Sequence, residues 1–301
     1  MKITLFGASG YMGHALWRHF RGAHELRVVS RSKPRFDAPF WAWDGENLGE
    51  WTRALDGAEA VINFAGRTVN CRYTPENKRQ ILESRVRSTR ILGEAISRME
   101  TPPRVWLNAS TATIYRDERE RDMDENSGIL GSGFSVEVAK SWEAALFEAK
   151  APQTRRVALR MSMIFGRDAP VYEVFGRLVR LRLGGFQGDG GQIVSWIHER
   201  DCCRALEFLL ENDLGGPVNV CSPHPLPNRD FMRELREASG VKWGLFAPKM
   251  AMEIGAFLMK TETELPLKSR RAVPQRLLDA GFAFEFPTWR EAVRDIVQTA
   301  P

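Results

Sequence analysis

Three glycines at three-residue intervals follow an apolar run at the very start of the chain. The run is Ile3–Phe6, and the segment after it reads Gly7-Ala8-Ser9-Gly10-Tyr11-Met12-Gly13. A buried strand, a tight glycine turn and a helix in this order bring free backbone N–H groups and the positive end of a helix dipole to one point. Such a point binds the pyrophosphate of a dinucleotide. The start of the chain therefore predicts a Rossmann-type strand, turn and helix, with residues 7 and 9–13 at the cofactor.

The spacing of these glycines narrows the family of folds. It is G-x-x-G-x-x-G, which differs from the G-x-G-x-x-G of long-chain dehydrogenases and resembles the fingerprint of extended short-chain dehydrogenases/reductases and their epimerase relatives. A glycine-rich turn without a ligand is the alternative. The strand in front and the amphipathic stretch with Leu16 and Phe20 behind favour the dinucleotide interpretation.

Short β-type runs alternate with longer helical runs through the first half of the chain. Alternation of this kind predicts an α/β fold with a doubly wound parallel sheet. The expected strands are Lys2–Phe6, Leu26–Ser30, Ala60–Phe64, Val105–Ala109 and Val157–Arg160, and the clearest helices are Pro75–Met99, capped by Thr74, and Phe134–Lys150. Later we expect strands at Ile193–Ile197 and Val218–Cys221, and helices at Asp201–Leu210, Asn228–Ser239, Lys249–Met259 and Thr288–Gln298.

The pattern becomes looser after Phe165, and this predicts two units. We expect an NADP-binding Rossmann domain in residues 1–165, to which residues 192–221 return. Residues 166–191 and 222–301 would form a small, mostly helical substrate lobe. Because ligands of open α/β sheets bind at the carboxyl ends of the strands, the lobe should close over that edge.

Charge and cysteine usage limit the partners of this chain. The net charge of +5 comes from arginines scattered along the sequence, which suits a small anionic ligand better than nucleic acid. The four cysteines lack metal-ligand spacing and favour reduced thiols in the cytoplasm. The start of the chain has no signal-peptide pattern, and the apolar stretch from Met250 to Met259 is too short to span a membrane. We expect no membrane role, no metal and a monomer or homodimer.

The end of the second strand decides which dinucleotide is preferred. An acidic residue there would bind the ribose hydroxyls of NAD(H) and repel a 2′-phosphate. This chain instead has Ser30, Arg31, Ser32 and Lys33, whose donors can bind that phosphate. NADP(H) is therefore favoured over NAD(H), the alternative being that Arg31 and Lys33 form a solvated basic loop.

Two further segments are candidates for the cofactor site. Asn63-Phe64-Ala65-Gly66 ends the fourth strand and is similar to the N-x-A-G element of the same superfamily, whose small residues let the chain pass close to the cofactor. Trp43 and Asp44 follow the third strand and could flank the adenine, although Trp43 could equally pack in the core.

The chemical half of the site departs from the superfamily pattern. Asn108-Ala109-Ser110-Thr111-Ala112-Thr113-Ile114-Tyr115 resembles the S-S-A-x-V-Y segment of nucleotide-sugar epimerases and dehydratases, which places Thr111 at the catalytic hydroxyl and Ser110 beside it. The superfamily's Tyr-x-x-x-Lys reads Val136-Glu137-Val138-Ala139-Lys140 here, so the lysine is present without the tyrosine. Tyr115 is the favoured substitute acid/base, followed by Tyr73 and His198.

Several other motifs occur in an order typical of one narrower group. They are Ser84-Arg85-Val86-x-x-Thr89, Trp142-Glu143, Leu159-Arg160, Phe165-Gly166-Arg167-Asp168, Ser195-Trp196-Ile197-His198-x-x-Asp201, Gly216-Pro217-Val218-Asn219-Val220 and the ending from Pro274 to Thr288. Over nearly its whole length the chain resembles the atypical extended short-chain dehydrogenases, NAD(P)-dependent epimerase/dehydratase-like proteins with a C-terminal domain of unknown function. That resemblance implies that the missing tyrosine is a property of the group.

Four side chains complete the candidate site. Arg85 and Arg67 flank a strand end and could reach the nicotinamide or the substrate, while Trp196 and His198 end a strand beside the Gly-rich segment 184–191 and could contact the substrate. A solvated helical arginine and a structural histidine are the alternatives.

These features support three functional hypotheses. The leading one is an NADP(H)-dependent oxidoreductase or epimerase-like enzyme acting on a small oxygenated or anionic substrate. The second is a non-catalytic NADP(H) sensor that has lost its acid/base. The third is a nucleotide-sugar epimerase, which normally needs the tyrosine that this chain lacks.

Overall fold

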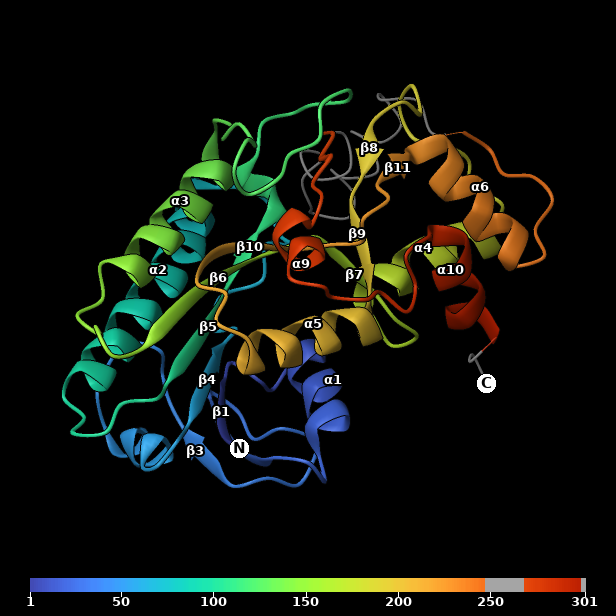
Figure 1. Cartoon of the computed structure of the whole chain (residues 1–301). Coiled ribbons are helices and arrows are strands. Elements are labelled where there is room, and N and C mark those ends of the chain that lie inside the picture. Colours follow the sequence, from blue (N-terminus) through green and yellow to red (C-terminus); the bar gives the residue numbers. More distant parts are fainter. Residues whose placement is uncertain (247–267, 299–301) are drawn as a thin grey trace.

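The computed structural model describes residues 1–246 and 268–298 of the chain (Figure 1). Its centre is a sheet of seven strands in the order β10-β6-β5-β4-β1-β2-β3, and every neighbouring pair is parallel. The strands are β1 (Lys2–Phe6), β2 (Glu25–Ser30), β3 (Phe40–Ala42), β4 (Ala60–Asn63), β5 (Val105–Thr111), β6 (Arg155–Met161) and β10 (Gly216–Val220). The predicted α/β fold with a doubly wound parallel sheet is confirmed.

Helices cover both faces of this sheet (Figure 1). On one side α1 (Tyr11–Phe20) packs beside α5 (Glu199–Glu211), and on the other α2 (Pro75–Ser97) packs beside α3 (Phe134–Phe147). Thr74 caps α2 as predicted, because its hydroxyl accepts a hydrogen bond from Asn77 N at 3.2 Å and Pro75 occupies the first turn. Two short 3₁₀ helices, η1 (Glu50–Leu55) and η2 (Ala112–Ile114), complete this part.

The remaining elements form a C-terminal lobe with its own core. It contains α4 (Pro170–Arg180), α6 (Asn228–Ala238), α10 (Trp289–Gln298) and the pairs β7 (Met163–Phe165) with β9 (Trp196–His198) and β8 (Ile193–Val194) with β11 (Leu226–Pro227). Phe165, Trp196, Phe231 and Trp289 pack together as its aromatic centre. The helix α4 is not among the elements predicted from the sequence, although Pro170 at its first turn is a typical start signal.

The segment 268–273 runs from this lobe to the edge of the parallel sheet and ends before α9 (Gln275–Asp279). Arg270 N donates to Ile193 O at 3.0 Å, and Val273 N donates to Met123 O at 3.2 Å. The segment therefore ties β8 to the loop that follows η2. The predicted helix Lys249–Met259 lies outside the described residues. Within the described ranges, no helix combines the length and apolar character needed to cross a bilayer.

Candidate functional site

The glycine turn between β1 and α1, called the glycine cradle below, is open to solvent at Gly10. Gly7 has φ +69°, and a Cβ built on it would lie 2.6 Å from Ala65 N, so the turn requires glycine here. A Cβ on Gly13 would lie 2.0 Å from Ala8 O, which shows how closely α1 approaches the turn. Gly10 is different, because a Cβ there would meet nothing within 4 Å. The space in front of Gly10 is therefore free of protein atoms.

The start of α1 carries no acidic side chain that would repel an anion. Gly10 occupies the N-cap without any side-chain cap, and the first turn contains no acidic residue. The N–H groups of that turn therefore keep their hydrogen-bonding capacity and the positive dipole end is not neutralised. The Tyr11 side chain points away toward α5, where burial and then Glu199 raise the pKa of its phenol. Tyr11 can thus contribute its main chain to the cradle.

The end of β2 presents a basic, exposed loop. Ser30 is buried and donates to Ser32 O at 2.7 Å, which folds the chain into a tight turn. Arg31, Ser32 and Lys33 are all exposed on this turn, beside the glycine cradle because Gly7 N donates to Val29 O. No carboxylate of the described chain forms an ion pair with Arg31.

Trp43 lies behind this region rather than on it. It is 5% exposed, and its ring packs edge-on against Phe6 with centroids 5.5 Å apart and against Trp51 at 4.7 Å. Asp44 accepts hydrogen bonds from Glu46 N and from both Asn47 N and Nδ2, which lowers the pKa of its carboxyl. Aromatic packing thus places Trp43 in the core, in agreement with the alternative interpretation of this residue.

Buried side-chain amides hold the segment from Asn63 to Gly66 in its conformation. Asn63 Nδ2 donates to Asn108 Oδ1 at 2.7 Å, and Asn63 Oδ1 accepts from Ala65 N at 2.9 Å. These bonds fix the chain after β4 against the glycine turn, where Phe64 N donates to Phe6 O. Asn63 is fully buried, so it positions this segment, whereas Gly66 is exposed on it.

Arg85 supports the same segment from α2. Its Nη1 donates to Arg67 O at 2.9 Å and to Ile81 O at 3.1 Å, and its guanidinium lies 5.0 Å from the Trp142 ring centroid. Burial lowers the pKa of Arg85 to about 10. The Arg67 side chain is turned toward the start of α2, since Nη2 donates to Asn77 Oδ1 at 2.9 Å. The two arginines predicted from sequence are therefore brought together at one strand end.

Two threonine hydroxyls lie close together where β5 ends and η2 begins. Thr111 Oγ1 donates to Thr113 Oγ1 at 3.0 Å, and both side chains are half-buried. Ser110 instead donates to Glu143 Oε1 at 2.7 Å and is 3% exposed. Ser110 is thus buried and bonded to Glu143, whereas the Thr111 hydroxyl is half-buried and bonded only to its neighbour Thr113. Thr113 was missed in the sequence, where it stands at the variable position of the S-S-A-x-V-Y segment.

Tyr115 is part of a buried polar network. Its hydroxyl donates to Asn219 Oδ1 and accepts from Arg160 Nη1, each at 2.9 Å. Arg160 in turn forms a two-pronged ion pair with Glu143. Burial raises the pKa of Tyr115 to about 12, and the residue has no exposed surface. These contacts argue against Tyr115 as a substrate acid, because its hydroxyl is enclosed and its hydrogen bonds are made within the protein.

The α3 helix brings Val136 and Lys140 to the same edge of the sheet. Val136 is buried, while Lys140 Nζ is half-buried and donates to Gly131 O at 3.1 Å and to Glu137 Oε1 at 3.3 Å. The lysine of the superfamily pair is thus held at the start of the helix, and an aliphatic side chain stands where the tyrosine would be.

The two candidate substrate residues of β9 are structural. Trp196 has no exposed surface, packs on Trp289 and donates to His224 O at 3.2 Å. His198 caps α5, since its Nδ1 accepts from Arg200 N at 3.1 Å, and its Nε2 lies 3.3 Å from Asp295 Oδ2. Burial lowers the pKa of His198 to about 4, so the ring is neutral at pH 7. The lobe core encloses both side chains, which favours the alternative of structural residues over direct contact with a substrate.

Comparison with known proteins identifies the family. The profile of the NAD-dependent epimerase/dehydratase family matches residues 3–221. The chain belongs to this family. Residues 247–296 match a second profile, that of a domain of unknown function (DUF1731). The family resemblance predicted from the sequence is thereby confirmed.

Individual relatives match nearly the whole length of the chain. Epimerase family protein ML0860 of Mycobacterium leprae is 31% identical, over 97% of this chain and 94% of its own length. A solved structure of human epimerase family protein SDR39U1 with NADPH is 26% identical, covers 99% of this chain and 100% of that one, and superposes with a TM-score of 0.89. A nucleoside-diphosphate sugar epimerase of Corynebacterium glutamicum has a TM-score of 0.78 at 25% identity, with 98% of this chain and 57% of that one covered.

Proposed function

We propose that this protein binds NADP(H) and uses it as an oxidoreductase or epimerase-like enzyme on a small oxygenated or anionic substrate. The observation that carries the proposal is the exposed Arg31 at the end of β2, without an acidic residue, beside an open glycine cradle. The NADPH in the solved structure of human SDR39U1 supports the same cofactor for this chain.

Each part of the cofactor has a candidate partner. The pyrophosphate would lie on the main chain of residues 9–13, and the 2′-phosphate on Arg31 and Ser32. Lys140 would reach the nicotinamide ribose, as the resemblance implies, and Arg85 would keep Arg67 and Gly66 in place beside it. When bound, the nicotinamide supplies or accepts the hydride of the reaction.

The Thr111 and Thr113 hydroxyls would orient the substrate oxygen. Thr111 donates to Thr113, so the remaining proton of Thr113 is the one available to a substrate carbonyl or hydroxyl. A threonine hydroxyl does not ionise near pH 7, so this pair serves for hydrogen bonding rather than as a strong acid.

A non-catalytic NADP(H) sensor is the second candidate. Val136 and the enclosed Tyr115 hydroxyl favour it, because general acid–base assistance is typically worth ~10²–10⁴-fold in rate. A nucleotide-sugar epimerase is the third candidate and is less favoured, since it needs the proton donor missing at position 136.

Cofactor binding is tested by titrating NADPH and NADH into the protein. We expect NADPH to bind more tightly, and Arg31→Ala to weaken NADPH by about 10–100-fold with NADH unchanged, since a hydrogen bond to a charged group contributes about 1.5–3 kcal/mol. Arg53→Ala is the matched control, because Arg53 is exposed on η1 and equally basic. Tighter NADH binding would contradict the proposal.

Catalysis is tested separately with NADPH and a panel of aldehydes, ketones and sugar nucleotides. Turnover that is lost in Thr111→Val and kept in Thr111→Ser would support an enzyme, because the valine replaces the hydroxyl by a methyl group of similar size, whereas the serine keeps the hydroxyl and loses only the methyl group. Tight NADPH binding without turnover on any member of the panel, together with NADPH-dependent capture of a protein partner, would favour the sensor.

A further inference from the structure

The C-terminal lobe carries a group of large apolar side chains at its surface, which we call the apolar patch. They come from two places in the chain, directly after α4 and shortly after α6. Each of the six is at least 40% exposed, and they are Leu181, Leu183, Phe186, Trp243, Leu245 and Phe246. Single exposed apolar residues are common, whereas a contiguous group marks a site of interaction.

Main-chain pairing brings the two segments of the patch together. Gly185 N donates to Leu245 O at 3.0 Å, and Leu245 N donates to Arg182 O at 2.8 Å. A Cβ built on Gly185 would lie 2.4 Å from Leu245 O, and one on Gly244 would lie 2.8 Å from Gly185 N. Glycine at both positions therefore allows the two main chains to approach each other closely.

Ring contacts across this pairing make the patch continuous. The rings of Phe186 and Phe246 are stacked, with centroids 5.6 Å apart and an angle of 20° between their planes. The Arg182 guanidinium lies 4.9 Å from the centroid of the Trp243 ring. The exposed side chains thus form one surface that includes a cation.

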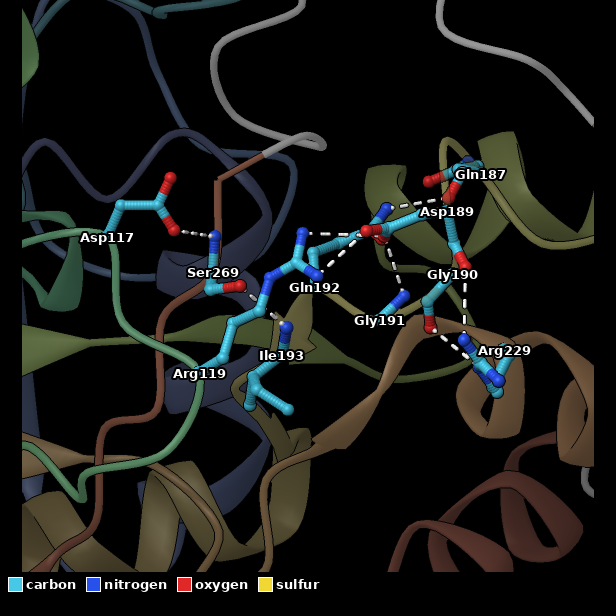
Figure 2. A network of polar contacts seen from close by, with 10 residues as sticks. All are labelled: Asp117, Arg119, Gln187, Asp189, Gly190, Gly191, Gln192, Ile193, Arg229 and Ser269. Carbon is cyan, nitrogen blue, oxygen red and sulfur yellow. Dashed lines mark hydrogen bonds and ion pairs between the residues drawn. The ribbon is translucent and has the colours of Figure 1, made fainter.

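The chain directly after Phe186 is fixed by hydrogen bonds (Figure 2). Gln187 O accepts from Gln192 Nε2 at 3.0 Å and from Gly190 N at 2.9 Å. Gln187 is itself buried, and its N–H donates to Asn228 Oδ1 at 2.8 Å at the start of α6. One edge of the patch is thus already held in place, so less backbone entropy is lost when the patch binds a surface.

The charges beside the patch are positive. Residues 174–186 and 241–246 contain no Asp or Glu but four exposed basic residues, Arg177, Arg180, Arg182 and Lys242. No carboxylate within residues 1–246 and 268–298 forms an ion pair with any of these four. Along the described chain the nearest carboxylates are Glu173, Asp189 and Glu237. Asp189 pairs with Arg119 at 2.8 Å (Figure 2), and Glu237 lies 3.7 Å from Arg233.

This combination of apolar and basic side chains fits an anionic lipid surface. Basic side chains can reach lipid phosphates while their aliphatic stems and neighbouring Trp, Phe and Leu side chains enter the layer beneath. A second copy fits less well, because a twofold contact would bring the cations of both copies together. A single-stranded nucleic acid would stack on the rings but gain nothing from Leu181, Leu183 and Leu245.

We propose that the apolar patch docks this protein on an anionic lipid surface. Its aromatic and leucine side chains enter the interface, and the four basic residues beside it pair with lipid phosphates. The expectation of no membrane role rested on the lack of a spanning segment, and docking on the surface needs none. The inference goes beyond the proposed NADP(H)-dependent function and does not depend on it.

The test is flotation of the full chain with two kinds of vesicle, phosphatidylcholine alone and phosphatidylcholine mixed with an equal amount of phosphatidylglycerol. We expect binding to the mixed vesicles only, and release at high salt, because salt screens the attraction. The charge variant Arg180→Gln/Lys242→Gln should weaken binding at least about tenfold. The apolar variant Leu183→Ser/Phe246→Ser should weaken it by a similar factor, at least about tenfold, because it removes two side chains that enter the interface.

Two matched controls carry the same changes outside the patch. Arg53→Gln/Arg90→Gln removes two exposed charges from η1 and α2. Phe147→Ser/Leu278→Ser removes side chains that are 37% and 40% exposed on α3 and α9. Both controls should bind the mixed vesicles as the unaltered protein does. Thermal unfolding and NADPH affinity are measured on every variant and should be unchanged, which separates loss of docking from misfolding.

Several results would overturn the proposal. They are no binding to the mixed vesicles, equal binding to both kinds of vesicle, unchanged binding in either patch variant, and an equal loss in the matched controls. Dimers in solution, or binding of a single-stranded oligonucleotide, would assign the patch to that partner instead if either were lost in the patch variants and no vesicles were bound.

Discussion

The hydroxyl of Tyr115 lies 2.9 Å from Nη1 of Arg160, enclosed below the carboxyl end of β5. Arg160 is also paired with Glu143, which accepts from Ser110. Two hydroxyls that the sequence offers for catalysis are thus joined through one buried ion pair. The network joins β5, α3 and β6 below the strand end that carries Thr111, so we expect it to position this end rather than to transfer protons.

Tyr115→Phe is therefore expected to reduce stability and to leave NADPH affinity unchanged. The variant leaves Arg160 and Asn219 without a shared partner, and an unsatisfied buried polar group costs about 1–3 kcal/mol. Urea unfolding measures this difference, and an NADPH titration of the folded variant provides the comparison. Unchanged stability with complete loss of turnover would restore Tyr115 as a candidate acid.

Two alanine substitutions in the glycine turn should have opposite effects. Gly13→Ala places a methyl group against Ala8 O and is expected to lower the melting temperature. Gly10→Ala meets no protein atom, so the fold should be unaffected while NADPH affinity falls at least about tenfold, because the methyl group occupies the pyrophosphate space. Normal NADPH binding by folded Gly10→Ala would show that the cofactor does not approach this turn.

Acid should destabilise the lobe through His198. Its pKa is lowered to about 4 in the folded protein from an unfolded value of about 6.5, so between these pH values the unfolded chain binds the extra proton. Stability is then fully present above about pH 6.5 and is lost as the pH falls toward 4, by up to about 3 kcal/mol. His198→Asn keeps an acceptor for Arg200 N but does not titrate, so its unfolding free energy should change less over this range. Equal pH dependence of both proteins would contradict this assignment.

Arg85→Met should separate stability from cofactor binding. The charge of Arg85 is buried and has no carboxylate partner in residues 1–246 and 268–298, so its removal should change the free energy of unfolding by less than about 1 kcal/mol. The lost hydrogen bond to Arg67 O should loosen the segment beside Gly66 and weaken NADPH binding. Arg87→Met, an exposed position on the same helix, is the control. Strong destabilisation by Arg85→Met would contradict this expectation. It would show that the hydrogen bonds and the Trp142 contact of the guanidinium outweigh the cost of burying its charge.

Local patterns in the sequence predict the sheet well, because each strand and helix carries its own periodic signal. The five early strands and the capped helix α2 are found within a few residues of their expected bounds. The lobe was harder to predict. The strands β8 and β9 are two and three residues long, and β11 is two, so their pairing depends on partners far away in the chain.

In the candidate site, too, some residues could be predicted from the sequence and others could not. The cofactor residues follow from motifs of contiguous residues, whose backbone geometry is locally encoded. The roles of Trp43, Trp196 and His198 depended on burial, which no local pattern specifies for an aromatic ring that can pack or bind equally well. The cavity lined by Val136, Lys268 and Arg270 could not be predicted, because Lys268 and Arg270 are more than one hundred residues away from Val136 in the chain.

By itself, the sequence determined the parallel sheet, the glycine cradle, the basic end of β2 and the absence of the superfamily tyrosine, since all of these are carried by neighbouring residues. The tertiary structure alone decided which polar groups are enclosed and which remain accessible. It encloses Ser110, Tyr115 and His198 in buried hydrogen bonds, leaves Thr111 with Thr113 at a strand end, and brings two distant cations beside Val136. The physical reason is that desolvation and pairing depend on what packs around a side chain, which is settled only when the whole chain is folded.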